Sequence, residues 1–278
     1  MINTLLLPEL REMLATDDVA GLVEFCDAMH PARAAEFMEG LSPEETWRVL
    51  QAADPQKRVE IFEYLDQDRQ VEILEFGDPQ ETSQLIADMA PDDRVDLLKQ
   101  VEPETVDALM PLVPTEERRD INRLSQYPEG TAGSLMTTSV ARLPESLTVG
   151  QAIEEIAKQT KNHETIYYIY IVDSENHLRG LISARQLLMH LGTPDEPVAD
   201  LMQRDLVSVE ATDDREAVAA KVADYNFMAI PVVDHEHHLV GIITHDDVID
   251  VFREEAEEDA YRAVAIAPLE ETYLNTPL

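Results

Sequence analysis

The sequence predicts an α + α/β protein of two unlike parts, a superhelical all-helical repeat domain over residues 1–126 and a duplicated α/β unit over residues 135–253. Three observations predict this division. A turn or N-cap residue recurs every twelve residues from His30 to Pro114. A β-α-β-β-α order of elements then occurs twice. A helix dense in acidic residues, with a short tail, is expected over residues 254–278.

Each twelve-residue unit predicts one short helix that must stack on its neighbours. The units open at His30-Pro31, Ser42-Pro43, Asp54-Pro55, Asp66-Gln67, Asp78-Pro79, Ala90-Pro91, Glu102-Pro103 and Pro114-Thr115. Proline suits the first helical position, and acids in the first turn complement the helix dipole. A helix of two to three turns is marginal alone, so the units are expected to form a superhelix that ends near Leu124, with Trp47 in its core.

A linker at residues 127–134 precedes two related copies, at residues 135–198 and 199–253. Three pairs of segments mark the duplication: Leu135-Met136 with Leu201-Met202, Ile171-Val172-Asp173 with Val232-Val233-Asp234, and Gly180-Leu181-Ile182-Ser183 with Gly241-Ile242-Ile243-Thr244. Alternating and β-branched runs predict strands, and helical periodicity predicts helices. Strands are expected at 139–143, 166–172, 178–182, 207–209, 228–233 and 239–243, and helices at 149–159, 185–190, 215–225 and from 246.

The charge of the chain restricts its partners. Lys and Arg total 21 against 57 Asp and Glu, a net charge of −36, which disfavours nucleic acid and attracts cations. A strongly solvated surface, as in halophiles, would give the same composition. The single cysteine, Cys26, fits a reducing compartment and is expected to be a small apolar helix residue. A nucleophile elbow, a phosphate loop and a clustered metal triad are all missing, so we expect no enzyme.

Acidic residues form a stripe on the last expected helix. Between Asp250 and Asp259 there are six acids and one base, Arg253. At 100° per residue the acidic stripe holds Asp247, Asp250, Glu254 and Glu258, and the apolar side holds Val248, Ile249, Phe252, Ala256 and Ala260. Like charges four residues apart cost about 0.2–0.5 kcal/mol per pair, and a facing acidic surface would add more repulsion. A divalent cation would turn this repulsion into a bridge.

Magnesium suits such a surface, because Mg²⁺ accepts one or two carboxylates and keeps several waters. The sequence has neither the spacing of an EF-hand nor a Cys/His zinc pattern. His235, His237 and His238 are grouped, but they fall in a turn between apolar strands and are expected to be exposed loop residues. Mn²⁺ and Ca²⁺ are alternative ions for carboxylate sites.

The duplicated unit resembles a tandem pair of CBS domains, in which an apolar strand ending in Asp leads to a turn, a Gly-apolar-apolar-Ser/Thr segment and a helix. This resemblance implies dimerisation and, in many members, an adenine nucleotide between the copies. The nucleotide-binding form has Ser or Thr followed three positions later by Asp. Thr244 and Asp247 match that form, whereas Ser183 is followed by Gln186. The resemblance therefore implies at most one such site, with ATP as the candidate ligand.

Nearly the whole chain resembles the cytosolic region of the MgtE-type magnesium channels. The matching features are the helical repeat, the Tyr-Pro-Glu-x-x-Ala-Gly-x-Leu-Met-Thr junction from Tyr127, the run from Glu164 to Tyr170 and the acidic helix. In that family a connecting "plug" helix leads into a membrane pore. The resemblance implies a homodimer through the CBS domains at the cytoplasmic face of the inner (plasma) membrane. The transmembrane pore domain would lie beyond this chain.

The resemblance also implies which residues bind Mg²⁺. They are Asp92, Asp93 and Asp96 in the helical domain, the Ala223 carbonyl and Asn226, and Asp247, Asp250, Glu255, Glu258 and Asp259, with Asp214 and Glu216 as weaker candidates. Two positions depart from the pattern of the family. Asn226 stands where an acid is common, which removes a charge from that site, and Gly130 replaces an acid in the linker.

Two hypotheses of different classes follow. In the first, Mg²⁺ bridges the helical domain, the CBS dimer and the connecting helix into a compact state that holds an attached pore closed. In the second, the chain is an adenine-nucleotide-sensing CBS regulator whose helical domain binds a partner protein.

Overall fold

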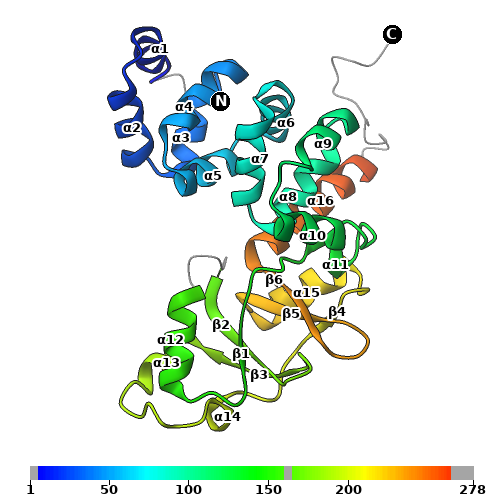
Figure 1. Ribbon diagram of the computed structural model, residues 1–278. Helices are drawn as coiled ribbons and strands as arrows, with labels where there is room; N and C mark the ends of the chain where they lie inside the picture. The colour runs from blue at the N-terminus through cyan, green and yellow to red at the C-terminus, as the bar shows by residue number, and fades with distance from the viewer. Residues whose placement is uncertain (1–5, 160–164, 264–278) are drawn as a thin grey trace. The chain divides into compact units, whose positions relative to one another are not determined.

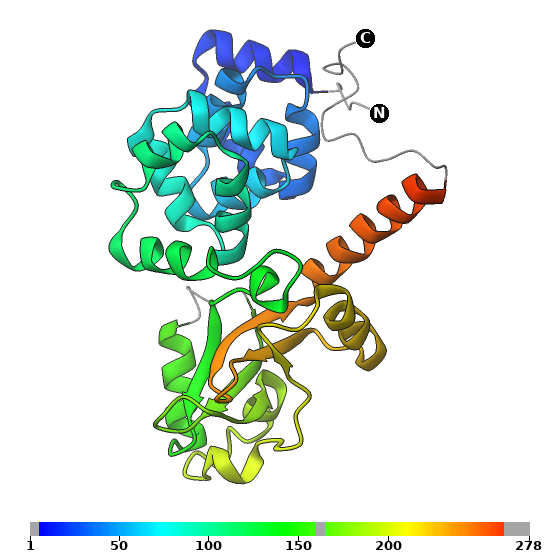
Figure 2. The ribbon, with the colours of Figure 1, turned by 90° about the vertical axis from the view of Figure 1, so that its right-hand side faces the viewer.

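The computed structural model describes residues 6–159 and 165–263, and it describes the side chains of these residues except those at 159 and 257–263. The chain divides into two compact units, residues 1–125 and 126–278 (Figures 1 and 2). Unit 1 is all-helical and unit 2 combines helices with two small sheets. Among the described residues, no helix has both the length and the apolar character needed to cross a membrane.

Unit 1 consists of successive short helices. Their bounds are α1 Leu7–Thr16, α2 Val19–Ala28, α3 Pro31–Met38, α4 Pro43–Ala52, α5 Pro55–Glu63, α6 Gln67–Phe76, α7 Pro79–Asp88, α8 Pro91–Gln100, α9 Pro103–Leu109 and α10 Thr115–Leu124. From α3 onward the N-caps run from His30 to Pro114 in steps of twelve. The predicted helical repeat is confirmed.

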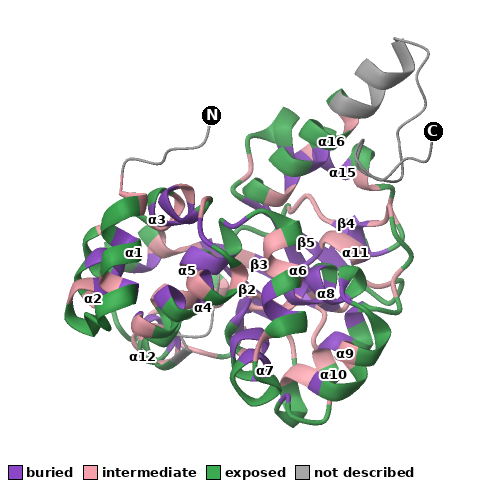
Figure 3. Ribbon diagram, turned by 90° about the horizontal axis from the view of Figure 1, so that it is seen from above, coloured by how far each residue is buried: buried purple, intermediate pink, exposed green. Residues whose placement is uncertain are grey.

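Helices of unit 1 pack against the helix two positions along the chain. Thus α2, α4, α6, α8 and α10 form one stack, and α3, α5, α7 and α9 form another. Figure 3 shows buried and exposed residues on different faces of these helices. Trp47 and Cys26 are both buried, as predicted. Burial raises the pKa of the Cys26 thiol to about 11, so this cysteine is an inert core residue rather than a reactive one.

Side chains at the fourth position of several helices donate hydrogen bonds to the free carbonyls at the end of the preceding helix. Arg58 donates to the carbonyls of residues 50, 51 and 53, Gln70 to those of 62, 63 and 65, and Arg94 to those of 86, 87 and 89. Arg118 reaches the Met110 carbonyl in the same way. The last carbonyls of a helix have no intrahelical partner. Each of these side chains therefore supplies hydrogen bonds to the last carbonyls of the preceding helix. The twelve-residue period fixes the spacing between the donor and those carbonyls.

Unit 2 contains the two predicted β-α-β-β-α modules. Module 1 has α11 Ala132–Leu135, β1 Val140–Pro144, α12 Val149–Gln159, β2 Thr165–Val172, β3 Leu178–Ser183 and α13 Ala184–Met189. Module 2 has α14 Val198–Leu201, β4 Val209–Glu210, α15 Arg215–Tyr225, β5 Ala229–Val233, β6 Leu239–Thr244 and α16 His245–Ala263. The sheets run β1-β2-β3 and β4-β5-β6, each with one parallel and one antiparallel pair. The short helices α11 and α14 were not predicted.

The segment before the first strand of each module pairs with the last strand of the other module. Thr137 pairs with Ile242 of β6, and Gln203 pairs with Leu181 of β3. A side chain at Gly241 would meet the Met136 sulfur at 2.8 Å, and one at Gly180 would meet the Met202 sulfur at 2.7 Å. The Leu-Met and Gly segments that mark the duplication are thus in contact with each other. Met136 of module 1 covers Gly241 of module 2, and Met202 of module 2 covers Gly180 of module 1.

The linker is attached to module 2. The backbone N–H groups of Ala132 and Gly133 donate to the carbonyls of Asp213 and Ala211, at 2.7 and 2.8 Å. Gly133 lies under the ring of Tyr127, because a Cβ there would come within 2.3 Å of that ring. Gly130 has a φ of 76°, in the left-handed region that glycine tolerates best. This conformation is a physical reason for glycine at this position.

Candidate functional site

The acidic helix α16 lies antiparallel against α15. At one end, Arg215 at the start of α15 forms ion pairs of 2.9 Å with Glu254 and 3.7 Å with Glu255. At the other end, the N–H of His245 donates to the carbonyl of Met228, just beyond the last turn of α15, at 3.1 Å. The two helices pack against each other. The pair therefore has two ends of different chemistry.

One end gathers four of the residues predicted to bind Mg²⁺. Ala223 and Asn226 belong to the last turn of α15, and Asp247 and Asp250 belong to the first turns of α16. Asn226 has a φ of 52°, and its N–H donates to the Ala223 carbonyl at 3.2 Å. Asn tolerates this left-handed conformation better than most residues. We call this group of four the Asn226 end. It offers a backbone carbonyl, an amide oxygen and two carboxylates as oxygen ligands.

Asp250 has the most open carboxylate of the Asn226 end. Its side chain is 68% exposed and lies 3.3 Å from Arg253 on the same helix. Asp247 is half-buried, and its carboxylate accepts hydrogen bonds from the Thr244 N–H at 3.1 Å and from the Thr244 hydroxyl. A cation would compete with a weak exposed ion pair at Asp250 and with helix capping at Asp247.

The other end already has a cation, the guanidinium of Arg215. Of the predicted residues, Asp214, Glu216 and Glu255 lie here. The Asp214 carboxylate caps α15 by accepting the N–H groups of Glu216 and Ala217, both at 3.1 Å. These contacts give structural roles to Asp214 and Glu255. The side chains of Glu258 and Asp259, also predicted to bind Mg²⁺, lie outside the described residues.

The remaining predicted acids belong to unit 1. Asp92 and Asp93 are in the first turn of α8, where Asp92 is buried and Asp93 is exposed. Asp96 pairs with Lys99 at 2.8 Å. Arg94, between them in the sequence, is buried, and burial lowers its pKa despite the nearby carboxylates of Glu117, Asp120, Asp92 and Asp88. Of these three acids, Asp93 and Asp96 are thus exposed and Asp92 is buried.

The predicted nucleotide residues form a helix cap. Thr244 donates its backbone N–H and its hydroxyl to the Asp247 carboxylate at the start of α16, as Ser183 does to the Gln186 amide oxygen at the start of α13. At Ser183 the Gln186 N–H also donates back to the hydroxyl, which completes a capping box. Sequence reasoning missed Tyr170, which is fully buried; its hydroxyl has no hydrogen-bond partner among the described residues. The run of tyrosines before it was the available signal, but only packing distinguishes Tyr170 from Tyr167, which is 62% exposed.

The apolar side of α16 is only partly buried. Val248 is buried, as is Val251, whereas Ile249 and Phe252 are each 45% exposed. The helix rests on unit 2 through a narrow stripe spaced three residues apart. Its second apolar stripe is left uncovered in the single chain.

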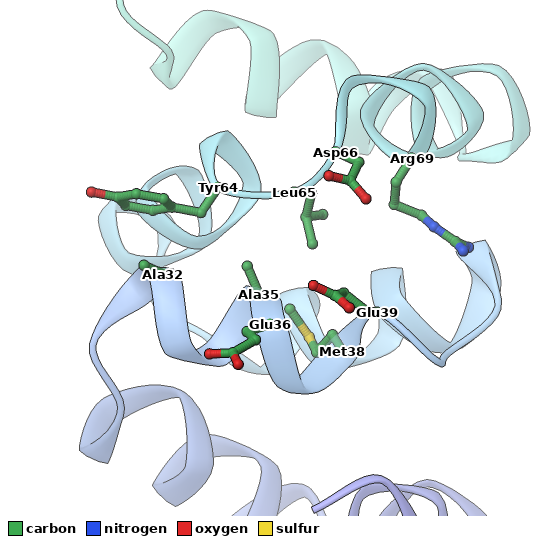
Figure 4. Close-up of a pocket in the computed structure, with 9 residues that line it drawn as sticks. All are labelled: Ala32, Ala35, Glu36, Met38, Glu39, Tyr64, Leu65, Asp66 and Arg69. Carbon is green, nitrogen blue, oxygen red and sulfur yellow. The ribbon is translucent and has the colours of Figure 1, made fainter. Parts of the chain in front are cut away.

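A pocket in unit 1 holds none of the predicted site residues. It measures about 140 Å³ and is lined by residues of α3, of α6 and of the segment before α6. Figure 4 shows the carboxylates of Glu39 and Asp66 directed toward the opening, with Arg69 at its edge. Pockets for nucleotide-sized ligands are about 300–1,000 Å³, so this pocket is too small for a nucleotide.

Family models match both parts of the chain. Residues 29–130 match the "MgtE intracellular N domain", and residues 132–193 and 198–254 match the "CBS domain". The "Magnesium transporter MgtE" of Enterococcus faecalis is 42% identical over 161 residues, and that of Thermus thermophilus is 39% identical over 158. These alignments cover 58% and 57% of this chain. The chain matches about a third of the length of these curated relatives, 35% of each.

Two solved structures share the fold over most of the chain. A structure of "the soluble part of a magnesium transporter" has a TM-score of 0.83 at 33% identity, covering 90% of this chain and 97% of that one. A structure of "the cytosolic domain of the Mg2+ channel MgtE in complex with ATP" has a TM-score of 0.80 at 33% identity, covering 87% and 98%.

Proposed function

The chain belongs to the MgtE family, with the MgtE N domain followed by two CBS domains, and we propose that it is the Mg²⁺-sensing, regulatory part of a magnesium transporter. In this proposal the role of the chain is regulatory and not catalytic. The named function of the curated relatives supports it, as does the acidity of the chain, with its net charge of −36.

The observation that carries the proposal is the Asn226 end of the α15–α16 pair. Two carboxylates, a backbone carbonyl and an amide oxygen lie toward one end of two antiparallel helices. Unit negative charges about 4 Å apart repel by roughly 4 kcal/mol at an effective dielectric of 20. The opposite end relieves such repulsion with Arg215. A divalent ion with several waters would do the same for Asp247 and Asp250.

In the proposed mechanism, cation binding links α16 to the rest of the molecule. When Mg²⁺ is plentiful, ions at the Asn226 end and at the acids of α8 favour a compact arrangement that holds an attached pore closed. When Mg²⁺ is scarce, repulsion among the acids loosens α16 and releases the helical domain. The pore and its membrane would follow this chain in a full-length transporter, with the chain at the cytoplasmic face.

Exposed apolar side chains support a homodimer through the CBS modules. One group lies in the last turn of α13 and just after it, and the other lies on α15, on α16 and in the loop after α15. They are Leu188, Met189 and Leu191 in the first group and Tyr225, Met228, Ile249 and Phe252 in the second, each at least 45% exposed. Counted from the equivalent Ser183 and Thr244, Leu188 and Leu191 of module 1 correspond to Ile249 and Phe252 of module 2. Such matched exposed apolar positions suit an interface between two copies of a pseudo-symmetric unit.

The test is a Mg²⁺ titration of the chain at constant ionic strength, with melting temperature and radius of gyration as readouts. We expect a higher melting temperature and a smaller radius in millimolar Mg²⁺, both weakened in Asp250→Asn. Glu154→Gln, which removes one exposed acid from α12, is the matched control. Unchanged melting and radius in Mg²⁺, or an equal effect of the two variants, would refute the proposal.

ATP is the second candidate ligand, as a modulator of the same sensor. The related structure with bound ATP and the Thr244–Asp247 pair support it. The buried Tyr170 hydroxyl is a further polar group in the core between the modules. Calorimetry with ATP should show binding that Thr244→Val and Asp247→Asn weaken. Binding equal in both variants and the parent would rule out this site.

A further inference from the structure

Each module of unit 2 has the same metal-ligand pattern, Asp-x-Glu-x-His, at the turn between its last two strands. The two turns are Asp173-Ser174-Glu175-Asn176-His177 and Asp234-His235-Glu236-His237-His238. In both, the Asp carboxylate accepts two backbone N–H groups of its own turn, which fixes its orientation. In both, the imidazole Nδ1 of the last residue lies against that carboxylate, at 3.0 Å in module 1 and 2.9 Å in module 2.

The two turns lie side by side. The rings of His177 and His238 stack with centroids 4.5 Å apart and planes at 21°. The Leu178 N–H donates to the His237 carbonyl at 3.1 Å, and the Leu239 N–H donates to the Asn176 carbonyl at 3.0 Å. The same pattern of residues thus occurs twice in nearly the same surroundings, so differences between the two copies are informative.

One such difference is the presence of a cation. In module 1, Arg179 lies two residues after His177 and places its guanidinium 2.8 Å from the Asp173 carboxylate. In module 2 the equivalent position holds Val240, which has no charge. The carboxylate of Asp234 therefore faces its histidine without the arginine that neutralises its counterpart.

The module 2 set has the geometry of an open ligand group. One ligand atom each from Asp234, Glu236 and His238 lies within 4.8 Å of the other two. The His238 Nδ1 is 2.9 Å from the Asp234 carboxylate and 3.8 Å from that of Glu236. The side chains are 30%, 65% and 26% exposed, so an ion can reach them from solvent while two of the three are held by packing.

We propose that Asp234, Glu236 and His238 bind one divalent first-row transition-metal ion, at the position that the guanidinium occupies in module 1. An imidazole nitrogen with two carboxylates suits Zn²⁺ or its neighbours, whereas Mg²⁺ prefers oxygen ligands alone. Metal–ligand distances of about 2.0–2.2 Å require only small movements of these side chains. The ion binds the Nδ1 lone pair, so the proton that Nδ1 shares with Asp234 is released or moves to Nε2. Water completes the coordination.

The site differs from the proposed Mg²⁺ sites in chemistry and in position. It belongs to the contact between the two modules, where the turn backbones pair. A bound ion would stiffen the β5–β6 turn against its counterpart in module 1. The sequence predicts the three grouped histidines to be exposed loop residues, and His235 and His237 are exposed. His238 alone gains this role, because Asp234 and Glu236 come within reach of its ring.

The experiment is Zn²⁺ calorimetry on the tag-free, metal-stripped chain in the presence of millimolar Mg²⁺, which occupies oxygen-only sites. We expect Zn²⁺ to bind, and His238→Gln and Asp234→Asn to weaken that binding by at least about tenfold. His177→Gln is the matched control in module 1 and is expected to leave binding unchanged. Circular dichroism melting in a chelator checks that each variant folds.

An exchange of the distinguishing residue provides a second test. Val240→Arg should place a guanidinium against Asp234 and abolish the site, and Arg179→Val should open a second site in module 1. The proposal is wrong if Zn²⁺ fails to bind, if His177→Gln weakens binding as much as His238→Gln, or if folded Val240→Arg binds Zn²⁺ as the parent does. Loss of binding in His235→Gln or His237→Gln but not in His238→Gln would also overturn it.

Discussion

The Nε atom of Arg94 lies 2.7 Å from the carbonyl oxygen of Ile86, at the end of the preceding helix. The same guanidinium also donates to Ala87 and Met89, and the side chain is only 4% exposed. Arg94→Met should therefore leave three carbonyls without their donor and destabilise unit 1 by about 2–4 kcal/mol, measured by urea unfolding. Arg58→Met, at the equivalent but more exposed position, should cost less. A loss for Arg94→Met no larger than that for Arg58→Met would contradict this account.

Arg215 should control how strongly α16 depends on divalent cation. Its ion pairs with Glu254 and Glu255 are partly exposed, so Arg215→Gln should cost less than about 1 kcal/mol in chelator. The variant leaves the surrounding carboxylates without their cation, and we expect Mg²⁺ to raise its melting temperature more than that of the parent. Arg185→Gln, which removes an exposed arginine from α13 in the other module, is the control. An equal Mg²⁺ response in parent and Arg215→Gln would count against this role.

Asn226→Asp should tighten cation binding at the Asn226 end. The substitution keeps the shape of the side chain and adds a third carboxylate to the Asn226 end. We expect the affinity for Mg²⁺ to rise by on the order of tenfold, equivalent to about 1.4 kcal/mol. In chelator the variant should be slightly less stable than the parent, because a negative charge at the end of α15 opposes the helix dipole. Calorimetry checks the first effect and thermal melting the second; no gain in affinity would place the ion elsewhere.

His238 should make stability depend on pH in a metal-free buffer. Its hydrogen bond to Asp234 raises its pKa from the ordinary 6.5 against the opposing effect of desolvation, and Glu236 and Asp173 act in the same direction as Asp234. A raised folded-state pKa stabilises the protein below pH 6.5, and this contribution is lost as pH rises through the folded pKa. His238→Gln should therefore lower the melting temperature more at about pH 6 than at about pH 9. An equal shift at both pH values would show that the charge of His238 is not stabilising.

Asp173, the module 1 counterpart of Asp234, should be protonated only in strong acid. Desolvation acts to raise the pKa of Asp173, but hydrogen bonds from the backbone N–H groups of His177 and Glu175 and from the His177 ring hold it at about 2. A depressed folded-state pKa gives stability above the ordinary value of 3.8 that is lost as pH falls toward 2. Asp173→Asn should flatten the acid side of the melting profile. NMR titration of the carboxyl carbon checks the value directly.

Replacing the two linker glycines by alanine should lower the stability of the protein by different amounts. Gly130→Ala meets open space and loses only the left-handed conformation, about 1 kcal/mol. Gly133→Ala places a methyl group against the Tyr127 ring and should cost about 1–3 kcal/mol. The cost at Gly133 should shrink in a Tyr127→Ala background, whereas the cost at Gly130 should not. Additive losses at Gly133 and Tyr127 in urea unfolding would argue against the contact.

The parts of this fold that the sequence predicts are those that local chemistry specifies. The helix starts of unit 1 follow from N-cap residues and prolines, whose conformational preferences act within a few residues. Helix bounds such as Val149–Gln159 and Arg215–Tyr225 agree with expectation, because each helix follows its own periodicity. The predicted start of β4 is two residues early, since pairing with β5 and not local preference selects Val209–Glu210.

Features that depend on packing could not be read from the sequence. The exposure of Ile249 and Phe252 depends on how α16 rotates onto unit 2, which a helical projection leaves undetermined. Residues 253 and 254, expected to separate module 2 from the connecting helix, both lie inside the continuous α16. In the candidate site, sequence and family resemblance indicated the acids and Asn226. The neutralising role of Arg215 emerged only from its contact across two helices.

The side chains that bind the carbonyls at the ends of α4, α5, α7 and α9 give the array a direction. Arg58, Gln70, Arg94 and Arg118 each serve the helix before their own, so those four helices depend on the helix that follows them. Loss of helices from the beginning leaves these contacts in place among the helices that remain, whereas a cut after one of the four removes the donor to its last carbonyls. The repeat can therefore be shortened at low cost from only one side, and that side is the one distant from the CBS modules in sequence.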